Sequence, residues 1–270
     1  MARTQLQFEQ KPAWVMSFVD SLVMIKRSSA HIVRNTDQLL GTFFQPIMFL
    51  VLFSAVFGGA ISLALPEGVS YLSFLMAGII VQTVAFGSTT TAVAITNDLQ
   101  KGIVDRFRSL PMANSAVLNG HVVSDVFRNG ISTAVMLVAG LALGFRSSAS
   151  LLDWLLIAGI LLLFTLSFSW LMAIVGVLAK SVEGVQWLSF VIIFPLTFAS
   201  SAFVPTEGMN QYLKVFAENQ PISQVIEAVR ALMLGTPMGD HLFWAVFWCV
   251  LMLVIAVPIA INLFKKKTNN

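Results

Sequence analysis

Long apolar runs alternate with short polar segments along this chain. A helix needs about 20 apolar residues to cross the hydrocarbon core of a bilayer. Six runs reach that length, so the pattern predicts an all-α polytopic membrane protein with six transmembrane helices. The predicted spans are 39–64, 71–96, 119–145, 151–179, 185–204 and 241–264. Together they form one transmembrane domain over 39–264.

The region before the first span, 1–38, has an amphipathic rather than a spanning pattern. Apolar residues recur there at helical spacing, beside Lys26 and Arg27: Val15, Phe18, Val19, Leu22 and Ile25. This spacing predicts an N-terminal helix that lies in the membrane interface. The alternative is a soluble helix packed on a partner.

A second amphipathic segment lies between the fifth and sixth spans. Its apolar residues form one stripe: Ile222, Val225, Ile226, Val229, Leu232 and Met233. Pro221 precedes the stripe at a helix start, where its missing N–H costs nothing. Glu227 and Arg230 have the i,i+3 spacing of an ion pair. We expect short helices over 206–235 that dip into the outer leaflet or pack over the outer ends of the spans.

Composition supports a membrane protein and excludes several other classes. Hydrophobic residues make up 57% of the chain and charged residues only 11%, whereas soluble domains carry about 25% charged residues. The basic residues lie at the edges of the spans, so the +3 net charge does not indicate a nucleic-acid partner. The single cysteine, Cys249, excludes an intramolecular disulfide and a cysteine metal cluster.

The distribution of Lys and Arg predicts the orientation. In membrane proteins, Lys and Arg are enriched in the short loops on the cytoplasmic side of the membrane. One side holds thirteen of them: Arg3, Lys11, Lys26, Arg27, Arg34, Lys101, Arg106, Arg108, Arg128, Lys180, Lys265, Lys266 and Lys267. The other holds three: Arg146, Lys214 and Arg230. Both termini, including the basic tail 265–270, are therefore predicted to be cytoplasmic.

A charged segment, 97–111, interrupts the apolar pattern between the second and third spans. It contains five charged residues: Asp98, Lys101, Asp105, Arg106 and Arg108. Each would cost roughly 2.5–3.5 kcal/mol at a bilayer centre, and together roughly 15 kcal/mol. The segment must therefore lie at the aqueous face.

The same segment has the features of a short amphipathic helix. Asn97 and Gln100 are spaced for a capping box, and Pro111 ends the pattern. Four apolar residues share one face: Leu99, Ile103, Phe107 and Leu110. Gly102 has no side chain, so another backbone can approach the helix closely at this position. We interpret the helix as a docking element; the alternative is a charged loop that only sets the topology.

Motifs for nucleotide binding and catalysis are missing. The sequence has no G-x-x-x-x-G-K-[ST] phosphate loop, no H-E-x-x-H and no G-x-S-x-G. His121, Asp125 and Arg128 follow one another at helical spacing, and we favour a satisfied interfacial network over a proton relay or a metal pair. No span carries a carboxylate near its centre, which disfavours an ion-coupled carrier.

Three segments make the sequence similar to the type-2 ABC transporter permeases, in the branch with the daunorubicin-resistance and nodulation-factor export permeases. They are Asp98–Pro111, with its G-x-x-x-R-x-R-x-L-P pattern, Phe194–Pro205 and Asn219–Arg230. The first is the most specific. The six-span layout and the interfacial N-terminal helix also fit, so the resemblance covers nearly the whole chain.

This resemblance implies a permease subunit of an ATP-driven exporter of hydrophobic or amphiphilic substrates, in a bacterial or archaeal inner membrane. Two permeases, identical or different, would assemble with two ATPase subunits. MgATP would bind only to the ATPase, so this chain would hold no cofactor or metal and would not be an enzyme. The 97–111 helix would be the coupling helix that contacts the ATPase, through Asp98, Leu99, Lys101, Gly102, Asp105, Arg106, Phe107, Arg108, Leu110 and Pro111.

Candidate residues of a substrate pathway are mostly aromatic. Phe49, Phe53 and Phe57 share one face of the first span, where they line a pathway or face lipid. Phe198, Ser200 and Ser201 lie in the second matching segment. Two other classes of protein stay open: a secondary carrier of small molecules and an intramembrane enzyme.

Overall fold

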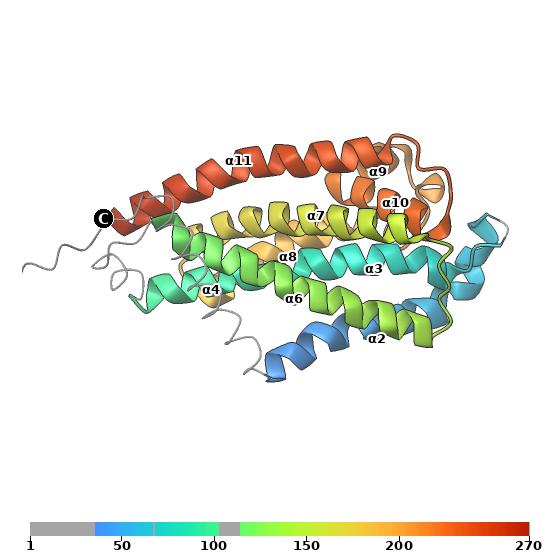
Figure 1. Cartoon of the computed structure of the whole chain (residues 1–270), viewed down its shortest axis with the longest axis horizontal. Coiled ribbons are helices and arrows are strands. Elements are labelled where there is room, and N and C mark those ends of the chain that lie inside the picture. The colour runs from blue at the N-terminus through green and yellow to red at the C-terminus, as the bar shows by residue number, and fades with distance from the viewer. Residues whose placement is uncertain (1–35, 67, 103–113, 270) are drawn as a thin grey trace, which may run out of the picture.

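The computed structural model of the chain describes residues 36–66, 68–102 and 114–269 (Figure 1). All regular elements within these ranges are helical. The N-terminal region 1–35, which includes the predicted interfacial helix, lies outside the described residues. The elements are α2 (Thr36–Ile61), η1 (Ser62–Ala64), α3 (Tyr71–Gly87), α4 (Thr89–Gln100), α6 (Asn114–Ala142), α7 (Leu151–Leu178), α8 (Val182–Phe198), η2 (Thr206–Gly208), α9 (Gln211–Asn219), α10 (Pro221–Leu234) and α11 (His241–Asn269).

Five described segments are long and apolar enough to cross a membrane: Phe44–Ala64, Tyr71–Gln100, Val117–Ala142, Leu151–Leu178 and His241–Thr268. The predicted fifth span, 185–204, differs. Its helix, α8, has 17 residues and ends at Phe198, which gives a length of about 25 Å against a hydrocarbon core of about 30 Å. The residues that follow, 199–204, form turns.

The long helices run side by side, with two of the five segments at the centre (Figure 1). In the most apolar window of α3–α4 78% of the residues are buried, and in that of α7 72%. The corresponding shares for α2 and α11 are 6% and 17%. The peripheral helices α2 and α11 are thus those whose apolar surface stays exposed.

A break divides the second membrane-length segment into α3 and α4. Ser88 lies between the two helices, and the backbone N–H of Thr91 bonds to Ser88 instead of Gly87. The carbonyl of Gly87 is therefore released from the regular helical ladder. Beyond the break, α4 packs tightly on α7, because a Cβ atom on Gly176 would lie 2.5 Å from the carbonyl oxygen of Ala92.

The short helices η2, α9 and α10 lie at the end of the bundle opposite the C-terminus (Figure 1). The predicted stripe is buried in α10 and joins the core of α3, α7 and α11. Pro221 occupies the first turn of α10, as predicted. The helix therefore packs over the ends of the long helices, which is one of the two expected arrangements.

The start of the charged segment departs from its prediction. Asn97 does not cap a new helix, because α4 continues through it and ends at Gln100. Gly102 then adopts a φ of 62°, a left-handed conformation that favours glycine at a helix end. Asn97–Gln100 is thus the last turn of α4. The remainder, 103–111, lies outside the described residues.

Candidate functional site

A groove opens among α2, α3, α4 and α8 and has a volume of about 580 Å³. It lies beside the break between α3 and α4, since residues on both sides of the break line it. The lining residues are Gln45, Pro46, Phe49, Gln82, Thr83, Phe86, Gly87, Thr89, Thr90, Val93, Gln186, Ser189, Phe190, Phe194 and Phe198.

The lining combines aromatic rings with uncharged polar groups. None of the described residues that line the groove is ionisable. Mostly apolar cavities of 300–1,000 Å³ with a few polar groups are typical of small-molecule sites. Because burying an unpaired charge is costly, a cavity with such walls favours uncharged groups.

Aromatic rings continue from the groove into a connected series. Phe190 and Phe194 lie 4.9 Å apart between ring centroids, and Phe194 and Phe198 lie 4.2 Å apart. Phe203 stacks on Phe198 at 4.8 Å and on Phe53 at 4.7 Å. The series therefore joins α8 to α2 through the turn that follows α8.

The predicted pathway residues fall into two groups. Phe49 and Phe198 line the groove, and Phe53 and Phe57 extend the aromatic series along α2. Ser200 and Ser201 are buried in the turn after α8 and do not line the groove. The Ser200 hydroxyl instead bonds within that turn, where it accepts from the N–H of Ala202 at 3.1 Å.

Behind the groove, an arginine contacts the break between α3 and α4. Arg128 of α6 donates from Nη2 to the carbonyl oxygen of Gly87 at 2.6 Å. It also forms an ion pair with Asp125, which accepts a hydrogen bond from Ser169 of α7. Asp125 is 1% exposed. Of the expected network, the Asp125–Arg128 pair is present and is buried inside the helix bundle, whereas His121 contacts Asp98 of α4 instead.

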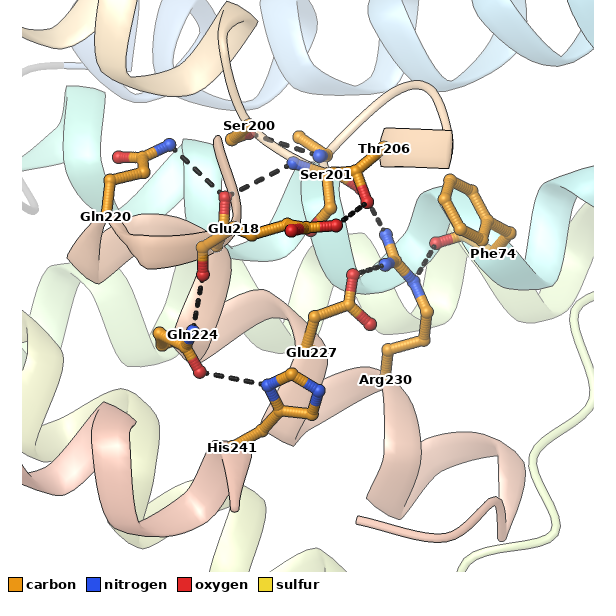
Figure 2. A network of polar contacts seen from close by, with 12 residues as sticks. Phe74, Ser200, Ser201, Thr206, Glu218, Gln220, Gln224, Glu227, Arg230 and His241 are labelled. Atoms are coloured by element: carbon orange, nitrogen blue, oxygen red, sulfur yellow. Dashed lines mark hydrogen bonds and ion pairs between the residues drawn. The ribbon is translucent and has the colours of Figure 1, made fainter. Parts of the chain in front are cut away.

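A second arginine holds the turn after α8 (Figure 2). Arg230 of α10 donates from Nη2 to the carbonyl oxygen of Ser201 at 2.6 Å and from Nε to that of Phe74 at 3.2 Å. Its guanidinium lies 3.6 Å from the centroid of the Phe74 ring. The predicted pair with Glu227 is present at 2.5 Å.

Arg230 is 5% exposed, whereas the side chain of Glu227 is 30% exposed. Burial lowers the pKa of the Arg230 side chain from the ordinary value, and the charge of Glu227 opposes that shift. The carboxylate therefore offsets part of the cost of burying the cation.

Further polar contacts hold α10 to its neighbours (Figure 2). Gln220 donates to the carbonyl oxygens of Leu196 and Ala199 at 2.6 and 3.1 Å, and so caps the end of α8. Gln224 contacts Nδ1 of His241 at 2.9 Å. These bonds fix the turn after α8, and with it the position of the last ring of the groove wall.

The described part of the charged segment is tied to the helix bundle. Asp98 contacts Nε2 of His121 at 2.9 Å, which joins α4 to α6. Gln100 donates to the carbonyl oxygen of Lys180 at 2.8 Å, while Leu99 packs on apolar side chains and Lys101 is exposed. The predicted docking residues Asp105, Arg106, Phe107, Arg108, Leu110 and Pro111 lie outside the described residues.

Of the residues that line the groove, sequence reasoning predicted only Phe49 and Phe198, and the ones it missed include Gln82 and Ser189. Both are polar residues in the middle of apolar runs, which is the signal that could have identified them. Among the described residues, no group of three or more His, Cys, Asp or Glu side chains could hold a metal ion.

Comparison with a profile of the family described as "ABC-2 type transporter" gives a match over residues 20–234. The matched range contains the groove, both arginines that contact the turns, and the charged segment.

Individual relatives cover the chain almost end to end. The chain is 32% identical to the daunorubicin resistance ABC transporter permease protein DrrB1 of Streptomyces coeruleorubidus, over 98% of this chain and 93% of the relative. It is 24% identical to the probable doxorubicin resistance ABC transporter permease protein DrrC of Mycobacterium tuberculosis, over 100% and 96%. Nodulation protein J of Rhizobium leguminosarum bv. trifolii is 25% identical over 75% of this chain and 76% of its own length.

Proposed function

The chain belongs to the ABC-2 type transporter family, and from this premise we propose that it is the permease subunit of an exporter of hydrophobic or amphiphilic molecules. The proposed substrates resemble drugs or antibiotics; lipids and lipid-linked saccharides are the alternative. A partner ATPase supplies the energy, so MgATP binds there and not to this chain.

The groove is the observation that carries the proposal. Its volume of about 580 Å³ suits a small molecule, and its uncharged lining suits a hydrophobic one. The relatives whose names include resistance to daunorubicin and doxorubicin support the choice of substrate class. Phe49 and Phe198 are proposed to contact the substrate, while Phe53 and Phe57 extend the same pathway.

The charged segment is the proposed contact with the ATPase. It follows α4, whose last turns are bonded to α6 and to the end of α7. A displacement of the segment would therefore move α4, and with it the wall of the groove that contains Thr89, Thr90 and Val93. Two ATPases and a second permease, identical or different, complete the proposed complex.

The orientation and the number of crossings are also proposals. The thirteen basic residues on one side favour cytoplasmic termini in a bacterial or archaeal inner membrane. We propose that α8, extended by the turn that Arg230 and Gln220 hold, completes a sixth crossing.

Two measurements test the proposed function. The first is copurification of the tagged permease with an ATPase that carries a phosphate loop and is encoded beside it. The second is drug-stimulated ATP hydrolysis by the reconstituted complex. We expect a stable complex and stimulation by hydrophobic drugs.

Variants of the charged segment test the docking contact. We expect Gly102→Trp and Arg106→Glu to reduce drug-stimulated ATP hydrolysis while the permease still inserts into the membrane. Lys214→Glu, at the opposite end of the bundle, is the control for a change of charge. Normal export by both segment variants would contradict the docking assignment.

A further inference from the structure

Two buried polar side chains of the groove each have an atom without a hydrogen-bond partner in the described part of the chain. Gln82 of α3 is 4% exposed and Ser189 of α8 is 1% exposed, and both line the groove. Among the described residues, neither Nε2 of Gln82 nor Oγ of Ser189 has a partner. Buried polar groups in proteins are nearly always paired, so two such groups in one cavity require an explanation.

Neighbouring hydroxyls in the same groove are satisfied. Thr83 donates to the carbonyl oxygen of Ile79 at 2.7 Å, and Thr90 donates to that of Gly87 at 2.9 Å. Such bonds to the preceding turn are the usual solution for Ser and Thr in helices. Gln82 of α3 and Ser189 of α8 are therefore exceptions among the lining residues, since their donors have no partner within the described part of the chain.

The two groups specify the chemistry of that ligand. The amide nitrogen of Gln82 can only donate, and the hydroxyl of Ser189 can donate or accept. Both are satisfied by an oxygen that accepts a hydrogen bond, such as that of a carbonyl or a hydroxyl. Since none of the described residues that line the groove is ionisable, an uncharged group suits the buried part of the ligand.

The aromatic side chains that line the groove indicate the shape of the ligand. Phe190, Phe194 and Phe198 follow one another at i,i+4 spacing on α8. Ser189 precedes the first of these residues in the chain and lines the same groove. Aromatic rings favour stacked or edge-to-face contacts with another ring. A flat aromatic molecule can contact the row of rings while its oxygen reaches Ser189 or Gln82.

We propose that Gln82 and Ser189 bind acceptor oxygens of an uncharged, flat aromatic ligand that packs along Phe190, Phe194 and Phe198. The role of this ligand as transported substrate rests on the proposed function. The binding site itself does not, because it requires neither ATP nor the ATPase.

Equilibrium binding of two matched probes tests the site. Fluorenone and fluorene share one flat aromatic skeleton and differ by one carbonyl oxygen. Binding is measured on the full chain in lipid nanodiscs, with empty nanodiscs as the correction for partition into lipid. We expect fluorenone to bind about tenfold more tightly, equivalent to about 1.4 kcal/mol. The anion fluorenone-4-carboxylate should bind about tenfold more weakly than fluorenone.

Variants connect this preference to the two residues. Gln82→Leu and Ser189→Ala should each reduce the affinity for fluorenone toward that for fluorene, with the affinity for fluorene unchanged. A damaged fold would instead lower both affinities. Gln211→Leu makes the same chemical change at an exposed position outside the groove and should keep the tenfold preference.

Three outcomes would overturn the site: equal binding of the two probes, no saturable binding of either, or a full preference for fluorenone in both variants. These outcomes are distinct from failure of the proposed function, which shows as the absence of an ATPase complex. A preference for fluorenone without such a complex would support the binding site and contradict the proposed function as an exporter.

Discussion

Two irregular turns border the groove, and the protein holds both by the same means. At the break between α3 and α4, Arg128 binds the carbonyl oxygen of Gly87. In the turn after α8, Arg230 binds that of Ser201. Each arginine comes from another helix and is paired with an acid three residues earlier. A guanidinium suits this position because it has several donors and keeps its charge.

The two arrangements differ in their contact with water. The side chain of Asp125 is 1% exposed and also accepts from Ser169, whereas the side chain of Glu227 is 30% exposed. A carboxylate with access to water attracts its cation less strongly, because solvent screens the pair. The two guanidinium groups are themselves similarly buried, with side chains 11% and 7% exposed. The same arginine–acid motif should therefore contribute differently to stability at its two positions, depending on how deeply the acid is buried.

The largest expected effect on stability is at the buried pair of Asp125 and Arg128. Asp125→Asn should destabilise the protein by about 3–5 kcal/mol, because it leaves the buried charge of Arg128 without its counter-ion. Chemical denaturation of the purified permease in detergent measures the change.

A double variant provides the control for this prediction. Asp125→Asn with Arg128→Gln removes both charges and should recover at least half of the lost stability. A single variant as stable as the unmodified protein would show that the pair is energetically neutral.

A substitution in α3 tests how rigid the turn after α8 is. A Cβ atom on Gly78 would lie 2.2 Å from the carbonyl oxygen of Ala202, which is backbone within this turn. We expect Gly78→Ala to cost about 2–3 kcal/mol, because the overpacked backbone must move. Gly58→Ala is the control, since a Cβ there meets nothing within 4 Å. Equal stability of the two variants would indicate a turn that shifts freely.

Stability should depend less on the pair of Glu227 and Arg230 than on the pair of Asp125 and Arg128. We expect Glu227→Gln to cost about 1–2 kcal/mol, because Arg230 keeps two carbonyl acceptors and the Phe74 ring. Denaturation under the same conditions as for Asp125→Asn gives the ratio. A cost equal to that of Asp125→Asn would contradict the argument that exposure sets the difference.

The smallest effect is expected at a pair on the surface. Lys214 and Glu218 of α9 are 3.7 Å apart with side chains 39% and 43% exposed. Lys214→Ala should change stability by less than about 0.5 kcal/mol. A larger loss would mean that exposure alone does not rank the ion pairs of this protein.

Local patterns predicted some elements well and others badly. The start of α10 and its apolar stripe are confirmed, because they depend on residues within a few turns. The capping-box spacing at Asn97 was misleading, since a helix that had already formed continued through it. The end of the predicted fifth span, after Phe198, is apolar enough for a helix but forms turns. Gln220 and Arg230, at the start of α10 and within it, bind these turns.

Local patterns likewise predicted only some of the residues that line the groove. Phe49 was predicted from an aromatic pattern and Phe198 from a segment similar to the permease family, and both line the groove. Gln82 and Ser189 were missed, because polar residues in apolar runs usually bond to their own helix. Only the positions of the neighbouring helices show that these two do not.

The sequence by itself determined that this is a multi-pass membrane protein of the ABC-2 family, and it located five of the membrane-length helices. Membrane-length helices follow from composition and from periods of a few residues, and family membership follows from the match to the family profile. All of these are properties of the chain. Only the tertiary structure decided that Arg128 and Arg230 hold turns beside one groove. Their partners are backbone carbonyls of other helices, and a carbonyl's need for a donor appears only after its own helix is broken.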